Sequence, residues 1–478
     1  MTTAELLESL KHSGIRLWVD GDNLRFRAPP GAMTPQLKQE LTERKPAVIK
    51  LLQQPDDARS QLVSRIPHID RSGPLPLSFT QEYLWLVQQI DPASPAYNVG
   101  VALQIDGPLD VSALSEALHQ IPQRHEVLRL RCVASEGRPE LSIAPALTID
   151  VALTDLQHLP ERECDAAVQA LAVADVEYPF DLAQPPLLRA KIVKTGSSRN
   201  VLLLTTHHFV ADGWSMRILM RELGALYEAR STGVRHQLPA LKCQYVDVAA
   251  WQREALDDRR QERELAYWRN RLSGLSDGLS LPTDFPRPPV QSHRGGRCQF
   301  QLPHSLCREL RALSRTEGVT LFMLLLAALK TLLHRYTQGS DVAVGTVVSN
   351  RSRVELEGLI GSFANSLVLR TECTGELTFR ELLGRVRETT IEALSHQDLP
   401  FGQLVNELQP DRDLSRNPLY QVQFVLHRDS LDETLVMPGL TVSRVATSQS
   451  TARFDLAWDL IDDGSQLSGT LEYSTDLF

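Results

Sequence analysis

The residues best suited to chemistry in this sequence are two adjacent histidines, His207 and His208, followed by Asp212 and Gly213. A histidine that is neutral near pH 7 can accept a proton from an amine or alcohol while that group attacks an acyl carbon. Two other interpretations stay open. The pair could be satisfied core histidines, or the two imidazoles and the carboxylate could ligate a metal ion.

The surrounding sequence places this group at the end of a buried strand. Residues 188–194 and 201–206 have the composition of strands, with a Gly-Ser-Ser turn between them. After Gly213, apolar residues recur at helical spacing: Met216, Leu219, Leu223 and Leu226. The pattern predicts a strand, a tight loop and a helix, with the polar residues held in the loop.

The strand geometry limits what the two histidines can do together. Adjacent strand residues point to opposite faces, so His207 and His208 cannot both face one cavity if the strand continues through them. One histidine is therefore expected to be structural, and the alternation does not say which. We expect the Asp212 carboxylate to meet an arginine and to fix the loop.

The composition excludes several classes of protein. The chain has 478 residues, 42% of them hydrophobic, and a formal net charge of -9, which predicts packed cores in more than one lobe and argues against a nucleic-acid partner. No basic stretch followed by an apolar one marks the N-terminus for export. The apolar run at 319–329 is too short for a membrane span and predicts a buried core helix. Six cysteines without metal-ligand spacing complete the prediction of a cytoplasmic protein with no membrane partner.

The N-terminal residues 1–58 predict a small αββαα unit. Two short β-prone runs, 15–20 and 23–28, flank Gly21 and Asp22, which suit a hairpin turn. Helical patterns precede and follow this hairpin. Residues 59–74 are interpreted as a linker that contains Pro, Ser and Gly.

The remaining chain mixes helix and strand signals and predicts an α/β (α+β) fold. A proline cluster at 282–289 lies near its middle, so we expect two lobes, at 75–245 and 246–478.

The motifs also resemble a known family. The segment from His207 to Gly213 is similar to the HHxxxDG signature of condensation domains of nonribosomal peptide synthetases, which belong to the chloramphenicol acetyltransferase-like acyltransferases. Five further segments resemble the other motifs of that family in the family's order: 77–85, 124–129, 245–251, 360–365 and 396–401. Residues 415–419 close the series, so the resemblance covers about residues 75–478.

This resemblance implies a V-shaped pair of acetyltransferase-like lobes, with the HHxxxDG loop halfway along a tunnel open at both ends. It implies that an acyl thioester on an upstream donor carrier protein meets an aminoacyl group on a downstream acceptor carrier protein, itself loaded by an adenylation domain, and that an amide forms. The phosphopantetheine arms then belong to the carrier proteins, and the chain needs no cofactor or metal of its own.

The resemblance also assigns roles to residues. It makes His208 the catalytic histidine, either as a base or by positioning the amine. It makes Asp212 architectural, in a salt bridge with Arg124 or alternatively with Arg351. Gly213 is expected to permit the turn of the loop.

Some positions depart from the family pattern. Tyr83 stands where an arginine is usual, and Leu130 and Ser362 also differ, which bears on specificity rather than on activity. The absence of a DxxxxD pattern argues against a heterocyclising relative. Residues 208–215 look most like the subtype that joins an L-configured donor to an L-configured acceptor.

The first 58 residues resemble TubC-like docking domains. Such domains bind the C-terminal docking tail of the preceding synthetase subunit as an added strand, and Arg25 and Arg27 could pair with an acidic tail. Two alternative functions remain open for the whole chain. One is an acyltransferase that uses a free amine or alcohol acceptor, and the other is a non-catalytic module that recruits carrier proteins.

Overall fold

The computed structural model describes residues 66–233, 238–275, 278–408, 413–428, 435–445 and 451–478, together with Val48 and two strands near the N-terminus. The chain divides into two compact units. The first comprises residues 1–69 with 351–358, and the second comprises residues 70–350 with 359–478.

In the first unit, the predicted hairpin is confirmed. Strand β1 (Arg16–Asp20) pairs antiparallel with β2 (Asn23–Arg27), so that residues 21 and 22 connect them. Helix α13 (Val354–Glu357) belongs to the same unit. The helices that we predicted on either side of the hairpin lie outside the described residues.

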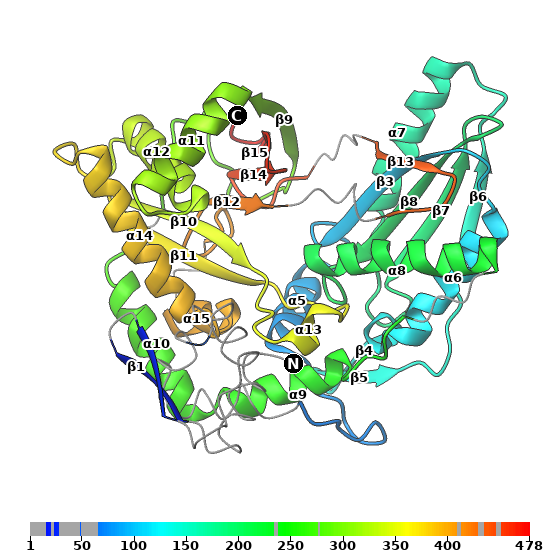
Figure 1. Ribbon diagram of the computed structural model, residues 1–478, viewed down its shortest axis with the longest axis horizontal. Helices are drawn as coiled ribbons and strands as arrows, with labels where there is room; N and C mark the ends of the chain where they lie inside the picture. Colours follow the sequence, from blue (N-terminus) through cyan, green and yellow to red (C-terminus); the bar gives the residue numbers. More distant parts are fainter. Residues whose placement is uncertain are drawn as a thin grey trace. The chain divides into compact units, whose positions relative to one another are not determined.

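The second unit contains a five-stranded sheet that carries the predicted chemical group (Figure 1). Its strands, in the order in which they pair, are β13 (Thr441–Arg444), β3 (Asn98–Asp106), β8 (Arg199–His207), β7 (Leu188–Lys194) and β6 (Val151–Asp155). Strands β6 and β7 are parallel, and the other pairs are antiparallel. Strand β8 is buried along its length beyond Arg199, as its continuous apolar run predicts.

One strand of this sheet comes from the far end of the chain. Strand β13 lies well beyond the predicted lobe boundary at residue 245, yet it pairs with β3 from Thr441 opposite Asp106 to Arg444 opposite Leu103. The first sheet therefore needs residues from both predicted lobes.

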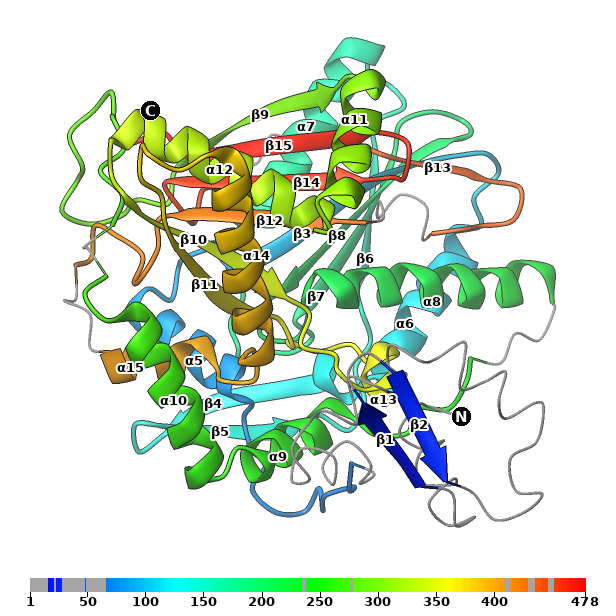
Figure 2. The ribbon, with the colours of Figure 1, turned by 60° about the vertical axis from the view of Figure 1, so that its left-hand side comes forward.

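Helices cover this sheet. They are α5 (Phe79–Ile90), α6 (Val111–Arg124), α7 (Glu161–Glu177) and α8 (Gly213–Thr232), with the short helix η1 (Glu126–Arg129) leading into the hairpin of β4 (Leu130–Ser135) and β5 (Arg138–Ile143). Helix α7 packs Val168 and Ala172 against Ala102, Val201 and Leu203 of the sheet. Helices α6 and α8 lie side by side (Figures 1 and 2).

A six-stranded sheet forms the rest of the second unit. Its strands, in pairing order, are β11 (Asn365–Glu372), β10 (Asp341–Val348), β12 (Val422–His427), β14 (Leu456–Asp462), β15 (Leu467–Ser474) and β9 (Gly295–Leu302). The helices of this part are α9 (Tyr245–Ala255), α10 (Asp258–Leu272), α11 (His304–Thr316), α12 (Leu321–Thr337), α14 (Phe379–Ser395) and α15 (Phe401–Leu408). Figure 2 shows α11, α12 and α14 in front of this sheet.

The core of this part confirms the predicted buried helix. The apolar run from residue 319 enters α12, whose Leu326 and Ala327 are fully buried with Val342 and Val344 of β10. Lys330 of the same helix is also fully buried, and its ammonium group donates to the Val342 carbonyl at 2.8 Å and to the Leu369 carbonyl at 2.5 Å. In the described part of the chain, no single helix has the length and apolar character to cross a membrane, although α11 and α12 pass that test together across a bend of 105°.

Candidate functional site

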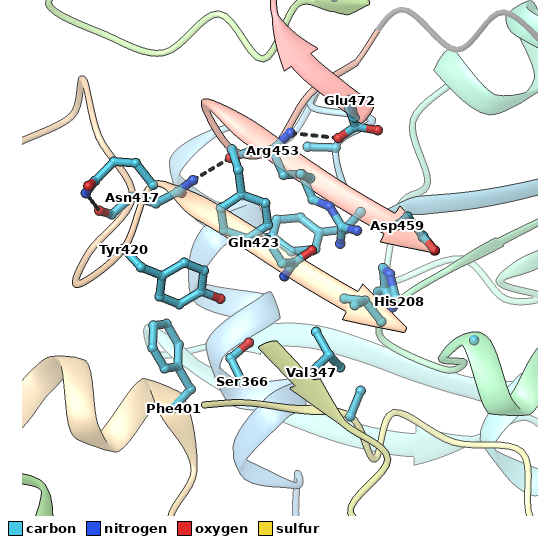
Figure 3. A pocket seen from close by; sticks show the side chains of 18 of the residues that line it. His208, Val347, Ser366, Phe401, Asn417, Tyr420, Gln423, Arg453, Asp459 and Glu472 are labelled. Carbon is cyan, nitrogen blue, oxygen red and sulfur yellow. Dashed lines mark hydrogen bonds between the residues drawn. The ribbon is translucent and has the colours of Figure 1, made fainter. Parts of the chain in front are cut away.

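A cleft of about 3830 Å³ in the second unit is lined by residues of both sheets. The loop after β8 contributes His208 and Gly213, while the six-stranded sheet contributes Gln423 and Asp459 on its face away from the helices. Figure 3 shows this wall, with Arg453 above Gln423 and His208 at the right, below Asp459. The alternation of β14 produces this arrangement, because Leu460 packs in the core while its neighbour Asp459 faces the cleft.

His207 is the structural member of the histidine pair. It is the last residue of β8, it is 4% exposed, and its ring Nδ1 accepts a hydrogen bond from the Phe209 N–H at 3.1 Å. Burial lowers the pKa of His207 to about 4, and the nearby positive charge of Arg189 adds to this effect. The ring is therefore neutral at pH 7, and it holds the loop rather than facing the cleft.

His208 faces the cleft because the strand ends one residue before it. Its backbone N–H donates to the Tyr97 carbonyl at 2.8 Å, and its ring meets the Tyr97 ring edge-on at 6.4 Å between centroids. Burial lowers the pKa of His208 to about 3, the charges of Arg453 and His207 lower it further, and a hydrogen bond to the Ala211 backbone opposes them. At pH 7 this imidazole is uncharged and can accept a hydrogen bond.

Asp212 joins the loop to the segment before β11. Its carboxylate accepts from the Ser215 N–H at 2.8 Å, the Ser215 hydroxyl at 2.7 Å and the Phe363 N–H at 3.1 Å. The first of these bonds caps the N-terminus of α8. The Ser215 hydroxyl also accepts from the Gly361 N–H at 3.0 Å. Asp212 is 2% exposed, and its carboxylate holds the backbone of the loop and of the segment before β11.

The predicted salt bridge between Arg124 and Asp212 is wrong. Arg124 Nε donates to both oxygens of Glu222, at 3.0 and 3.1 Å, and Nη2 donates to the Pro239 carbonyl at 2.6 Å. The reason is geometric: Arg124 ends α6, which lies beside the middle of α8, whereas Asp212 lies at the start of α8. Arg351 belongs to the other compact unit, so its pairing with Asp212 stays a prediction.

Glu222 is a buried residue that the sequence reasoning missed. His125 Nε2 lies 2.8 Å from its carboxylate, which Arg124 also contacts. Burial acts to raise the pKa of Glu222, but the hydrogen bond from His125 and the charges of His125 and Arg124 hold it below its ordinary value. The signal was present, since Glu222 stands among the apolar residues of the predicted helix.

The expectation that Gly213 permits a turn is also wrong. Its φ lies outside the left-handed region, and it is the first residue of α8. An added Cβ would meet no atom within 4 Å. Because Gly213 lines the cleft, the missing side chain leaves open space beside His208.

Several tyrosines of the cleft are site residues that the sequence did not indicate. Tyr83 and Tyr97 both line the cleft, and the proximity of Tyr97 and burial raise the pKa of Tyr83 well above its ordinary value. Tyr420, which is 3% exposed, also lines the cleft, and burial raises the pKa of its hydroxyl. The family pattern marks Tyr83 as unusual but gives it no place in the site.

Metal ligation finds no support in the described ranges. No group of three or more His, Cys, Asp and Glu side chains gathers there. Within the motif itself, His207 is turned away from the cleft and the Asp212 carboxylate is engaged by backbone and Ser215.

Comparison with known proteins identifies the family. The sequence profile of the condensation domain matches residues 71–478, and that of the TubC N-terminal docking domain matches residues 4–54. The chain belongs to the condensation-domain family. The mixed α/β fold and the family that the motifs indicated are thereby confirmed.

Individual relatives are nonribosomal peptide synthetases. The chain is 44% identical to one of the linear gramicidin synthase proteins of Brevibacillus parabrevis over 432 residues, which cover 90% of this chain and 6% of that protein. It is 42% identical to the phosphinothricin tripeptide synthetase PhsC of Streptomyces viridochromogenes, covering 86% of this chain and 38% of that protein. The chain thus spans a minor part of these relatives. The crystal structure of the X-domain from teicoplanin biosynthesis superposes with a TM-score of 0.78 and 29% identity, covering 87% of this chain and 93% of that one.

Proposed function

We propose that this chain joins a donor acyl or peptidyl thioester to an acceptor aminoacyl thioester by an amide bond, with each substrate carried on the phosphopantetheine arm of a carrier protein. The observation that carries the proposal is the position of His208 on a cleft lined from both sheets. The condensation-domain membership and the synthetase relatives support the same reaction class.

The proposed reaction needs little acid-base chemistry from the protein. The acceptor amine attacks the thioester carbonyl carbon, the C–S bond breaks, and the proton lost by the amine ends on the departing thiol of the donor arm. The protonated α-amino group has a pKa near 8. His208, with a pKa of about 3, is a much weaker base than that amine. We therefore assign His208 the task of accepting a hydrogen bond from the amine and holding it at attack distance.

The test replaces His208 and measures transfer between loaded carriers. His208→Ala is expected to abolish the amide product, detected by mass, without changing the thermal unfolding midpoint. His304→Ala, at an exposed position that begins α11, is the matched control and is expected to keep wild-type turnover. Full turnover by His208→Ala would remove His208 from the mechanism.

The same assay separates the alternatives. Equal use of a soluble amine or alcohol in place of the carrier-bound acceptor would favour an acyltransferase with a free acceptor. Binding of both carriers by wild-type protein without any product would favour a non-catalytic recruiting module. Matched L- and D-configured donors test the proposed L-donor, L-acceptor subtype, for which the L-donor is expected to be consumed faster.

We further propose that residues 1–58 select the upstream synthetase polypeptide by taking its C-terminal docking tail as an added strand beside the β1–β2 hairpin. The match to the TubC N-terminal docking domain over residues 4–54 supports this assignment. Deletion of residues 1–58 is expected to slow condensation only when the donor carrier is on a separate polypeptide. An equal loss with a donor carrier fused to the chain would contradict it.

A further inference from the structure

Arg453, which lies just before β14, differs from three nearby arginines in the partners of its side chain. Three arginines of the same region, Arg287, Arg294 and Arg297, each pair with a carboxylate. The half-buried Arg453 guanidinium forms no ion pair or hydrogen bond with any residue that the structure describes. The cleft contains this unpaired cation just before β14.

The backbone of Arg453 is anchored although its side chain is not. Its N–H donates to Glu472 at 3.4 Å, and its carbonyl accepts from the Asn417 side chain. These two contacts, drawn in Figure 3, fix the direction in which the side chain leaves the backbone. The side chain then extends toward the part of the cleft where His208 lies.

The positive charge of Arg453 acts to lower the pKa of three groups on separate elements. These groups are His208 after β8, Tyr83 of α5 and Tyr420 before β12. Arg453 and His208 both line the cleft, and Figure 3 shows the Arg453 side chain directed toward the part of the cleft where His208 lies. A reacting group bound between the two would contact both.

The nearby carboxylates are already engaged. Glu472 pairs with Arg297 at 2.8 Å, and Asp459 lies 3.2 Å from His427. Water in the open cleft can solvate the Arg453 charge, but bound substrate displaces water and leaves a cation that needs a negative partner. Attack on the thioester creates such a partner, because the carbonyl oxygen becomes negative in the tetrahedral intermediate.

We propose that Arg453 is a catalytic residue that stabilises the oxyanion formed when the acceptor amine attacks the donor thioester. This inference rests on the proposed function. As the C–N bond forms, the carbonyl electron pair moves to oxygen beside the guanidinium, and it returns as the C–S bond breaks and the thiol leaves with the amine proton. Arg453 remains protonated throughout. His208 holds the amine on one side, and Arg453 faces the oxygen on the other.

Kinetics of two Arg453 variants test the proposal. Arg453→Gln is expected to lower kcat about 100-fold, the usual effect of removing one oxyanion partner, with little change in KM. Arg453→Lys restores a positive charge and is expected to recover kcat to within about tenfold of wild type. The matched control is Arg335→Gln, which removes an exposed arginine of α12 that does not line the cleft and is expected to leave kcat unchanged.

Two kinetic results would overturn the proposal. The first is an unchanged kcat in Arg453→Gln. The second is a loss confined to KM and to donors with an acidic side chain, because that pattern means that Arg453 binds a substrate carboxylate in the ground state. A thermal unfolding midpoint equal to that of wild type establishes that the Gln variant is folded.

A binding measurement distinguishes failure of this inference from failure of the proposed reaction. The probe is a phosphonamidate linked to pantetheine, whose anionic tetrahedral phosphorus mimics the intermediate. Titration calorimetry is expected to show about 100-fold weaker binding to Arg453→Gln than to wild type, and equal binding of the neutral amide product. Equal binding of the phosphonamidate by both proteins refutes the Arg453 site. If the wild-type protein binds the phosphonamidate more tightly than Arg453→Gln does but makes no amide, the oxyanion site is supported and the proposed carrier-to-carrier reaction is refuted.

Discussion

Replacing glycine by alanine at three positions is expected to give three different outcomes. At Gly361 the new Cβ would lie 2.1 and 2.5 Å from two ring atoms of Tyr245 and 2.7 Å from the Phe363 ring. Tyr245 cannot move aside easily, because it is 1% exposed and its hydroxyl bonds the Ser78 hydroxyl at 2.8 Å and the Ser362 carbonyl at 2.6 Å. Overpacking of this kind costs about 1–3 kcal/mol, and the rigid ring places Gly361→Ala near 3 kcal/mol by this estimate.

The other two glycines serve as controls with opposite expectations. Gly384 lies inside α14, where a Cβ would meet nothing within 4 Å, so Gly384→Ala is expected to stabilise the protein by about 0.5–1 kcal/mol. Gly213→Ala also meets no atom within 4 Å and is expected to leave stability at or slightly above the wild-type value. Its methyl group enters the cleft beside His208, so amide formation is expected to fall.

The assay combines denaturant unfolding with the carrier-to-carrier reaction. Unfolding midpoints are expected to rank Gly384→Ala above wild type and Gly361→Ala well below it. If Gly361→Ala and Gly384→Ala unfold at the same denaturant concentration, the steric argument at Tyr245 is refuted. If Gly213→Ala turns over at the wild-type rate, the space beside it does not belong to the substrate path.

Two further predictions concern protons. Because the pKa of His208 is about 3, its charge does not change between pH 5 and 9. The rate of amide formation over this range is therefore expected to follow only the deprotonation of the acceptor amine and to level off above about pH 8. A second inflexion in the pH–rate profile between pH 5 and 7 would contradict a neutral imidazole. Burial lowers the pKa of Lys330 from 10.5 to about 7. Between these two pH values the unfolded chain binds a proton that the folded chain does not. The free energy of unfolding is therefore expected to rise with pH, by up to about 1.4 kcal/mol per pH unit. Lys330→Met is expected to remove this slope, and equal slopes in urea titrations of both proteins would contradict the assignment.

Local patterns predicted the elements around the chemistry well. Residues 188–194 form β7 as predicted, the run at 201–206 lies within β8, and the apolar spacing after Gly213 gives α8. Each of these elements is encoded within its own segment. The pairing of β13 with β3 was not predicted, because its two strands lie more than three hundred residues apart and neither carries a signal for the other.

The site was predicted less completely than the elements. Alternation along β8 predicted that one of the two histidines is structural, but it did not say which. In the structure the strand ends at His207, and His208, the first residue after it, faces the cleft. The Arg124 prediction failed because a different carboxylate, that of Glu222 on the neighbouring helix α8, pairs with the Arg124 guanidinium. Arg453 comes from yet another segment, and only the folded chain places it on the same cleft as the histidine loop.

Strand β13 has a consequence for the engineering of hybrid synthetases. It supplies the outer edge of the sheet, next to β3, whose other neighbour is the strand that ends in His207. In a recombinant enzyme in which only residues 75–245 are exchanged, β3 from one synthetase would have to pair with β13 from the other. Breakpoints that transfer residues 441–444 together with residues 75–245 preserve this pairing, and the two predicted lobes are therefore not independent units for exchange.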